Sequence, residues 1–207
     1  MKPASRRPAA ALAGVVMLVG TGACTEDSEP AATPSSSSSP SETVTTRPAS
    51  APLKVVVTRV SGRLPAEDRP ALEANVRRTL SAYVDAAFLA GDYPRTDFSG
   101  SFGAFTSGVA RDARRDQGLL TNQPLGGTTV AVRATRRTAY LSVLAPHKVA
   151  AGVTANVHLV FVVDRGDQPA QRVSLKGRLL LTRNSARDWS IFGYDLARSS
   201  TPVRSGS

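Results

Sequence analysis

Few residues in this chain are of the types that carry out acid–base or nucleophilic chemistry. It contains two histidines, His147 and His158, and a single cysteine, Cys24. Neither histidine has another histidine, a cysteine or an acid at the spacing typical of a metal site. No Gly-x-Ser-x-Gly motif and no glycine-rich phosphate loop occurs. The sequence therefore predicts no metal, no cofactor and no catalytic residue.

A small proton-transfer enzyme is the alternative. Such a site needs a carboxyl group in an apolar pocket, within hydrogen-bond reach of a phenol or an imidazole. The candidate pocket residues are Tyr83, Asp85, Tyr140, His158 and Tyr194. The opposing interpretation places Asp85 toward the polar side of its helix and makes the tyrosines core or rim residues. We expect a non-catalytic protein and keep the enzyme as the alternative.

Basic residues form the other candidate sites. Two clusters are candidates for binding anions: Arg111, Arg114 and Arg115 at helical spacing, and Lys176 and Arg178 on a strand. His158 is expected beside the second cluster. Clustered cations gain about 1 kcal/mol each near an anionic lipid surface. Asp112 and Asp116 partly neutralise the first cluster, so a solvated charged surface is the favoured interpretation of these basic residues, and anion binding is the alternative.

The N-terminus predicts export and a membrane anchor. Residues 1–23 combine a basic start, an apolar run and small residues, as in a signal peptide. Gly22, Ala23 and Cys24 resemble the lipobox of bacterial lipoprotein precursors, which implies that Cys24 carries the lipid. The protein would then be held on the extracytoplasmic face of the cell membrane. A conventional secretory signal followed by a free thiol is the alternative.

The segment that follows predicts a disordered tether over residues 24–52. It is rich in Ser, Thr and Pro and lacks the apolar residues that would offset the entropy cost of ordering. Three of the 26 cations precede the predicted cleavage site and all 16 acids follow it, so the mature chain carries a net charge of +7. A basic exported protein favours anionic surfaces. Nucleic acid is not an expected partner, because the few aromatic residues do not lie among the arginines.

Hydrophobic periodicity predicts one α+β domain over residues 53–199 and a disordered tail over residues 200–207. Residues 54–60 read as a first strand or an extended lead-in. Helices are expected from Asp68 to Gly91 and over 102–117, and a turn over 122–128. Strands are expected over 130–134, 139–145, 156–163, 173–181 and 189–194, with a bulge or bend at Gly177.

This order resembles the nuclear-transport-factor-2-like, cystatin-like cone, in which a curved antiparallel sheet wraps around a long first helix. Residues 82–88 (AYVDAAF), 91–93 (GDY) and 189–195 (WSIFGYD) are similar to envelope proteins of high-GC Gram-positive bacteria, among them the Mce-associated proteins. The resemblance implies a binding or accessory module for an apolar or lipid ligand or a transporter partner. A homodimer through the sheet face is a further expectation. Because the same cone hosts ketosteroid isomerase, it also keeps the enzyme alternative open.

Overall fold

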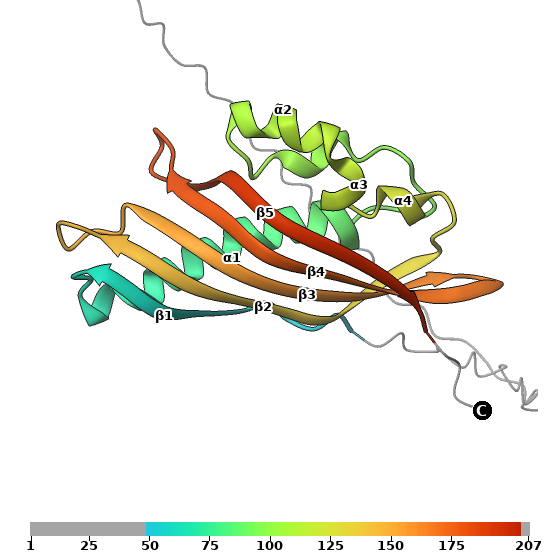
Figure 1. Cartoon of the computed structure of the whole chain (residues 1–207), viewed down its shortest axis with the longest axis horizontal. Coiled ribbons are helices and arrows are strands. Elements are labelled where there is room, and N and C mark those ends of the chain that lie inside the picture. Colours follow the sequence, from blue (N-terminus) through green and yellow to red (C-terminus); the bar gives the residue numbers. More distant parts are fainter. Residues whose placement is uncertain (1–48, 204–207) are drawn as a thin grey trace, which may run out of the picture. The chain divides into compact units, whose positions relative to one another are not determined.

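The computed structural model describes residues 49–203, which form an α+β domain built on one five-stranded sheet (Figure 1). The strands are β1 (Lys54–Gly62), β2 (Ala131–Ala145), β3 (Gly152–Arg165), β4 (Gln168–Arg183) and β5 (Trp189–Pro202). The helices are η1 (Ala66–Asp68), α1 (Arg69–Val84), η2 (Asp85–Leu89), η3 (Ser99–Phe102), α2 (Ser107–Arg115), α3 (Gln117–Leu120) and α4 (Gln123–Gly126). The predicted α+β class is confirmed.

The strands lie in the order β1-β2-β3-β4-β5. From β2 to β5 each strand pairs antiparallel with the next, as the sequence predicts. β1 pairs parallel to β2, so the prediction of a wholly antiparallel sheet is wrong at this edge. The reason is the connection: α1 carries the chain back along the sheet, and the next strand can then run in the direction of the first.

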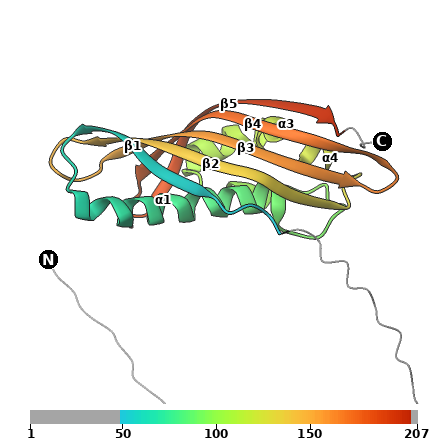
Figure 2. The same cartoon turned by 90° about the horizontal axis from the view of Figure 1, so that it is seen from below.

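All of the helices in the described part lie on one side of the sheet (Figures 1 and 2). α1 runs along that side, and its buried residues Leu72, Val76, Leu80, Tyr83 and Val84 recur at the predicted helical spacing. The helix continues through the π-helical turn η2 and ends before Gly91, whose φ of 90° favours glycine. The helix end at Gly91 is therefore confirmed.

The predicted helix over 102–117 is divided in the structure. η3 ends at Phe102, and residues 104–106 form an extended segment beside β5 before α2 begins. There Thr106 N–H donates to Ile191 O, and Ile191 N–H donates to Ala104 O, each at 2.9 Å. These bonds give the backbone an alternative to the helix. The predicted turn over 122–128 contains the short helix α4.

The ends of the domain differ slightly from the prediction. β5 continues to Pro202, past the expected boundary at residue 199, because Gln171 to Val173 of β4 pair with Ser200 to Pro202. At the other end Ala51 N–H donates to Ala134 O at 2.9 Å. The signal peptide, Cys24 and most of the predicted tether lie outside the described residues. Within residues 49–203, none of the helices is both long and apolar enough to cross a bilayer.

Candidate anion-binding face of the sheet

The side of the sheet that faces away from the helices is exposed, and we call it the outer face. Side chains alternate between the two sides of a strand. In β3 the residues from Val153 to Val163 in steps of two are buried against the helices, as the sequence predicts. The residues between them, including His158, therefore point to the outer face. The strand register places the residues opposite them on the same face.

The outer face carries many more cations than acids. Its cations are Lys54 and Arg59 from β1, Arg133 and Arg136 from β2, and Arg172, Lys176 and Arg178 from β4. Its carboxylates are Asp195 on β5 and, at the end of β3, Asp164. Asp164 accepts a hydrogen bond from Gly166 N–H in its own turn at 3.0 Å. Seven cations and two carboxylates on one open surface create a positive field above it.

His158 lies in the middle of these cations. Lys176 is its direct neighbour on β4, and Thr138 is its neighbour on β2. Arg136 Nη1 lies 3.3 Å from His158 Nδ1. Partial burial lowers the pKa of His158 below its ordinary value, and the charges of Lys176 and Arg136 lower it further. The predicted grouping of His158 with Lys176 is therefore observed, with Arg136 added to it.

Most cations of the outer face are not neutralised by ion pairs. Within residues 49–203, Arg178 is the member of this set that forms one, through Nη2 and the carboxylate of Asp195. Both side chains are exposed, so this pair is expected to contribute little to stability. Arg178 is thus less available to an external anion than Lys176, which lies beside His158.

Apolar groups accompany the cations on the outer face. The side chains of Tyr140 and Leu144 point outward from β2 on either side of Ser142. Their residues are 48% and 54% exposed, which is high for large apolar groups. Val56 of β1 lies directly beside Tyr140. The outer face therefore offers contact area as well as charge.

The first predicted cluster, Arg111, Arg114 and Arg115, lies on the helix side of the sheet. In α2, Arg115 forms an ion pair with Asp112. Asp116 accepts a hydrogen bond from the Tyr194 hydroxyl at 2.6 Å. Burial, followed by this bond, raises the pKa of Tyr194 to about 12. Arg111 and Arg114 are exposed, but the acids interleaved with them leave α2 with far less net charge than the outer face.

The five candidate pocket residues do not share a cavity. Tyr83 is fully buried, its hydroxyl donates to Leu120 O at 2.7 Å, and burial raises its pKa. Asp85 forms an ion pair with Arg137 at 2.9 Å, with side-chain exposures of 48% and 12%. Tyr140 and His158 lie on the opposite side of the sheet from Tyr83. These residues therefore do not assemble a proton-transfer site.

Aromatic side chains fill the space between α1 and the sheet. Phe88 stacks on Phe161 of β3 with ring centroids 4.6 Å apart. Tyr83 meets Phe105 edge to face at 5.1 Å. All four residues belong to one buried cluster. This packing fills the space between the helix layer and the sheet in the described residues.

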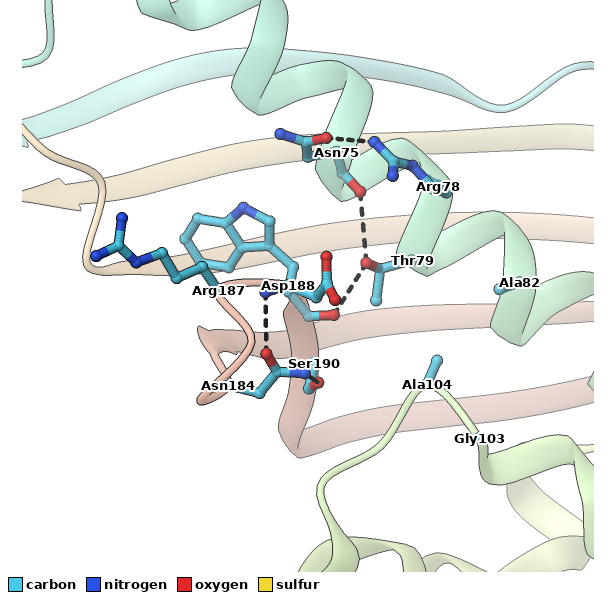
Figure 3. Close-up of a pocket in the computed structure, with 11 residues that line it drawn as sticks. Asn75, Arg78, Thr79, Ala82, Gly103, Ala104, Asn184, Arg187, Asp188 and Ser190 are labelled. Carbon is cyan, nitrogen blue, oxygen red and sulfur yellow. Dashed lines mark hydrogen bonds between the residues drawn. The ribbon is translucent and has the colours of Figure 1, made fainter. Parts of the chain in front are cut away.

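A shallow hollow of about 470 Å³ lies between α1, the loop at 103–104 and the turn from β4 to β5 (Figure 3). Thr79 Oγ1 donates to Trp189 O at 3.1 Å across it, and Arg78 donates to the side chain of Asn75. Arg187 and Asp188 bring opposite charges to its rim. Its polar groups largely bind one another, and it concentrates neither charge nor apolar surface.

The cations missed by sequence reasoning are Arg133, Arg136 and Arg172 and, on β1, Lys54 and Arg59. Arg172 has the same parity as Lys176 and Arg178, so strict alternation along β4 could have added it. Strict alternation along β2 would place Arg133 and Arg136 on opposite sides of the sheet. Both point to the outer face because the register shifts at Thr135. No pattern in the sequence marks that shift. Residues 49–203 contain no group of three or more His, Cys, Asp or Glu placed to hold a metal ion.

In comparisons with known proteins, no family model, no curated protein and no solved structure matches the chain. Its function must therefore be inferred from its own residues and their geometry.

Proposed function

We propose that this protein is a lipid-anchored module on the extracytoplasmic face of the cell membrane, with a non-catalytic binding or accessory role in the envelope. The observation that carries the proposal is a contrast between the two sides of the sheet. The helix side is filled by buried aromatic rings, whereas the outer face is open, basic and partly apolar. A domain built in this way binds through its surface.

The fold that we propose is the nuclear-transport-factor-2-like, cystatin-like cone. A long helix, short helices and then an antiparallel run of strands, in that chain order, support it. Sheets of this kind commonly leave one side free. Within this proposal the envelope partner meets the free side, and an apolar ligand inside the cone is less favoured because Phe88 and Phe161 occupy that space.

The enzyme alternative is less well supported. It needs an ionisable group enclosed in the cone. Asp85 is half exposed and paired with Arg137, and His158 lies on the outer face. A ketosteroid-isomerase-like mechanism therefore has neither its base nor its enclosed pocket among the residues considered for it.

The anchor is tested by expressing the full chain and its Cys24→Ala variant in a bacterium that lipidates proteins. We expect the wild type to enter the detergent-rich phase on phase separation and the variant to stay in the aqueous phase, because an acyl chain supplies about 0.8 kcal/mol per buried CH₂. Thr25→Ala is the matched control and should behave like the wild type. A Cys24→Ala variant that still enters the detergent phase would disprove the lipid anchor.

A further inference from the structure

We infer that the outer face of the sheet docks on an anionic lipid bilayer, so that the domain lies with this face against the headgroups. The inference rests on the proposed function, because it names the partner of the binding module described there. It goes beyond an anchor, since it assigns a second, protein-borne contact with the membrane.

Charge is the first reason. Residues 49–203 contain 21 basic and 12 acidic residues, a net charge of +9. The seven cations and two carboxylates of the outer face account for five of these nine charges. Each Lys or Arg side chain near an anionic leaflet contributes a similar amount of binding free energy, and these contributions add up over a wide surface. A single small anion could meet only a few of them.

The shape and chemistry of the face are the second reason. Its cations come from three strands and form no enclosed site: none of the hollows described for residues 49–203 is lined by Arg136, Arg172 or Lys176. Tyr140 and Leu144 project from the same surface. Tyrosine is favoured at the level of the headgroups, where its ring meets apolar groups and its hydroxyl meets water. A broad basic surface with scattered apolar groups suits a bilayer surface.

The path of the chain is the third reason. Ala51 is hydrogen-bonded to Ala134, next to Arg133 and close to Arg136. The segment that comes from the predicted anchor at Cys24 therefore enters the domain at the edge of the sheet, beside two cations of the outer face. A tether that enters at this edge keeps the domain close to the membrane, which raises the effective concentration of headgroups around the basic surface.

A second copy of the chain is a poorer occupant of this face. Pairing two outer faces would bring seven cations against seven others, and like charges in an interface cost free energy. The hydroxyl and amide groups of the face, such as Thr138, Asn156 and Ser174, offer no negative charge to offset this. The bilayer supplies the missing charge.

The test uses the mature full chain, residues 24–207, with Cys24→Ser so that no acyl chain is attached. Sedimentation measures its binding to vesicles of phosphatidylcholine alone and to vesicles with equal parts of phosphatidylcholine and phosphatidylglycerol. We expect binding to the anionic vesicles only, weakening steeply as salt is added because exposed charges are screened. Since this protein has no lipid, the result is independent of the Cys24→Ala experiment.

A matched pair of variants locates the contact. Arg136→Gln, Arg172→Gln and Lys176→Gln together should weaken binding to anionic vesicles about a hundredfold. This estimate adds the binding free energy that each of the three cations contributes near an anionic surface. Arg111→Gln, Arg114→Gln and Arg115→Gln remove the same number of charges from α2, on the helix side, and should weaken it less than about threefold. Circular dichroism spectra and melting curves check that both variants are folded.

Three results would overturn the inference. The first is equal binding of the wild-type chain to both kinds of vesicle. The second is an equal loss of binding in the two triple variants, which would show that only net charge matters. The third is binding to soluble polyphosphate without binding to anionic vesicles. If a triple variant does not fold, Lys176→Gln alone, compared with Arg111→Gln, tests whether the contact lies on the outer face.

Discussion

At the scale of single residues, the pKa of His158 reflects the positive electrostatic potential at the outer face. Its ring lies between Lys176 and Arg136, and no carboxylate is its direct neighbour across β2 or β4. Partial burial and these two cations lower its pKa. Protonation of His158 is therefore disfavoured in the free protein, and any partner that brings negative charge to the face should reverse the effect.

We predict that the pKa of His158, measured by NMR titration of its ring protons, lies below 6.5 in the free protein. Lys176→Gln should raise it, because a neighbouring positive charge is removed. Arg111→Gln on the helix side is the control and should leave it unchanged. Anionic vesicles should also raise it, so binding should strengthen as the pH falls through this pKa. A pKa above 6.5 in the free protein would contradict a positive field at the outer face.

The same shift affects stability in a defined direction. Between the lowered pKa and the ordinary value of 6.5, the unfolded chain binds more protons at His158 than the folded chain does. The contribution of this group to the free energy of unfolding therefore rises with pH across that window. As the pH falls through it, the stability of the free protein decreases, while its affinity for an anionic surface increases.

At the scale of elements, β4 and β5 come unusually close at Gly177. This residue has a φ of 135°, and a Cβ built on it would overlap the carbonyl oxygen of Asp195. The sequence predicted a bulge or bend here. The register runs through Gly177 without a shift, so there is no bulge at this residue, and the ladder is continuous where the two backbones approach closely. Gly177 lies between Lys176 and Arg178, two cations of the outer face.

We predict that Gly177→Ala lowers the free energy of unfolding by about 2 to 4 kcal/mol, because alanine disfavours this φ and its Cβ has no room. Gly108→Ala, in α2, is the control: nothing lies within 4 Å of its Cβ position, so no loss is expected. Urea unfolding measures both. A Gly177→Ala protein as stable as the wild type would mean that β5 can move away from β4.

The elements also show what the sequence could and could not provide. The buried face of α1 and the alternation of buried and exposed residues in β3 follow from the spacing of apolar residues in the sequence alone. Each element buries one side, so its apolar residues recur at the helical or the strand period. The parallel pairing of β1 and the division of the second helix depend on tertiary contacts, such as the bonds between Thr106 and Ile191. Arg136 points to the outer face only because of the register shift at Thr135, and no local sequence pattern predicts that shift.

At the scale of the whole molecule, charge and apolar surface are separated by the sheet. The helix side holds the buried aromatic cluster, including Phe88 and Phe161, and the side chains of β5 that contact α2 and α3. The outer face holds the largest share of the net charge. Sequence composition gave the total charge of the chain but not its distribution, because the distribution depends on which side each strand residue faces.

This distribution bears on the oligomeric state. A homodimer through the sheet face was a sequence-based expectation, and for many open sheets it would be reasonable. Here the two faces would repel each other, with Lys54, Arg136 and Lys176 of one copy opposed to cations of the other. We therefore predict that the unlipidated mature chain is a monomer at low salt, where repulsion is least screened.

Sedimentation equilibrium at low and at high salt checks this prediction, and the mass at low salt should be that of one chain. Tyr140→Arg adds a cation to the outer face, whereas Arg114→Gln changes the helix side only. A dimer at low salt that Tyr140→Arg disrupts and Arg114→Gln does not would place a second copy on the outer face. That result would leave the bilayer only the sheet edge near Ala51 as a contact surface, since the cations of the outer face would be buried between the two copies.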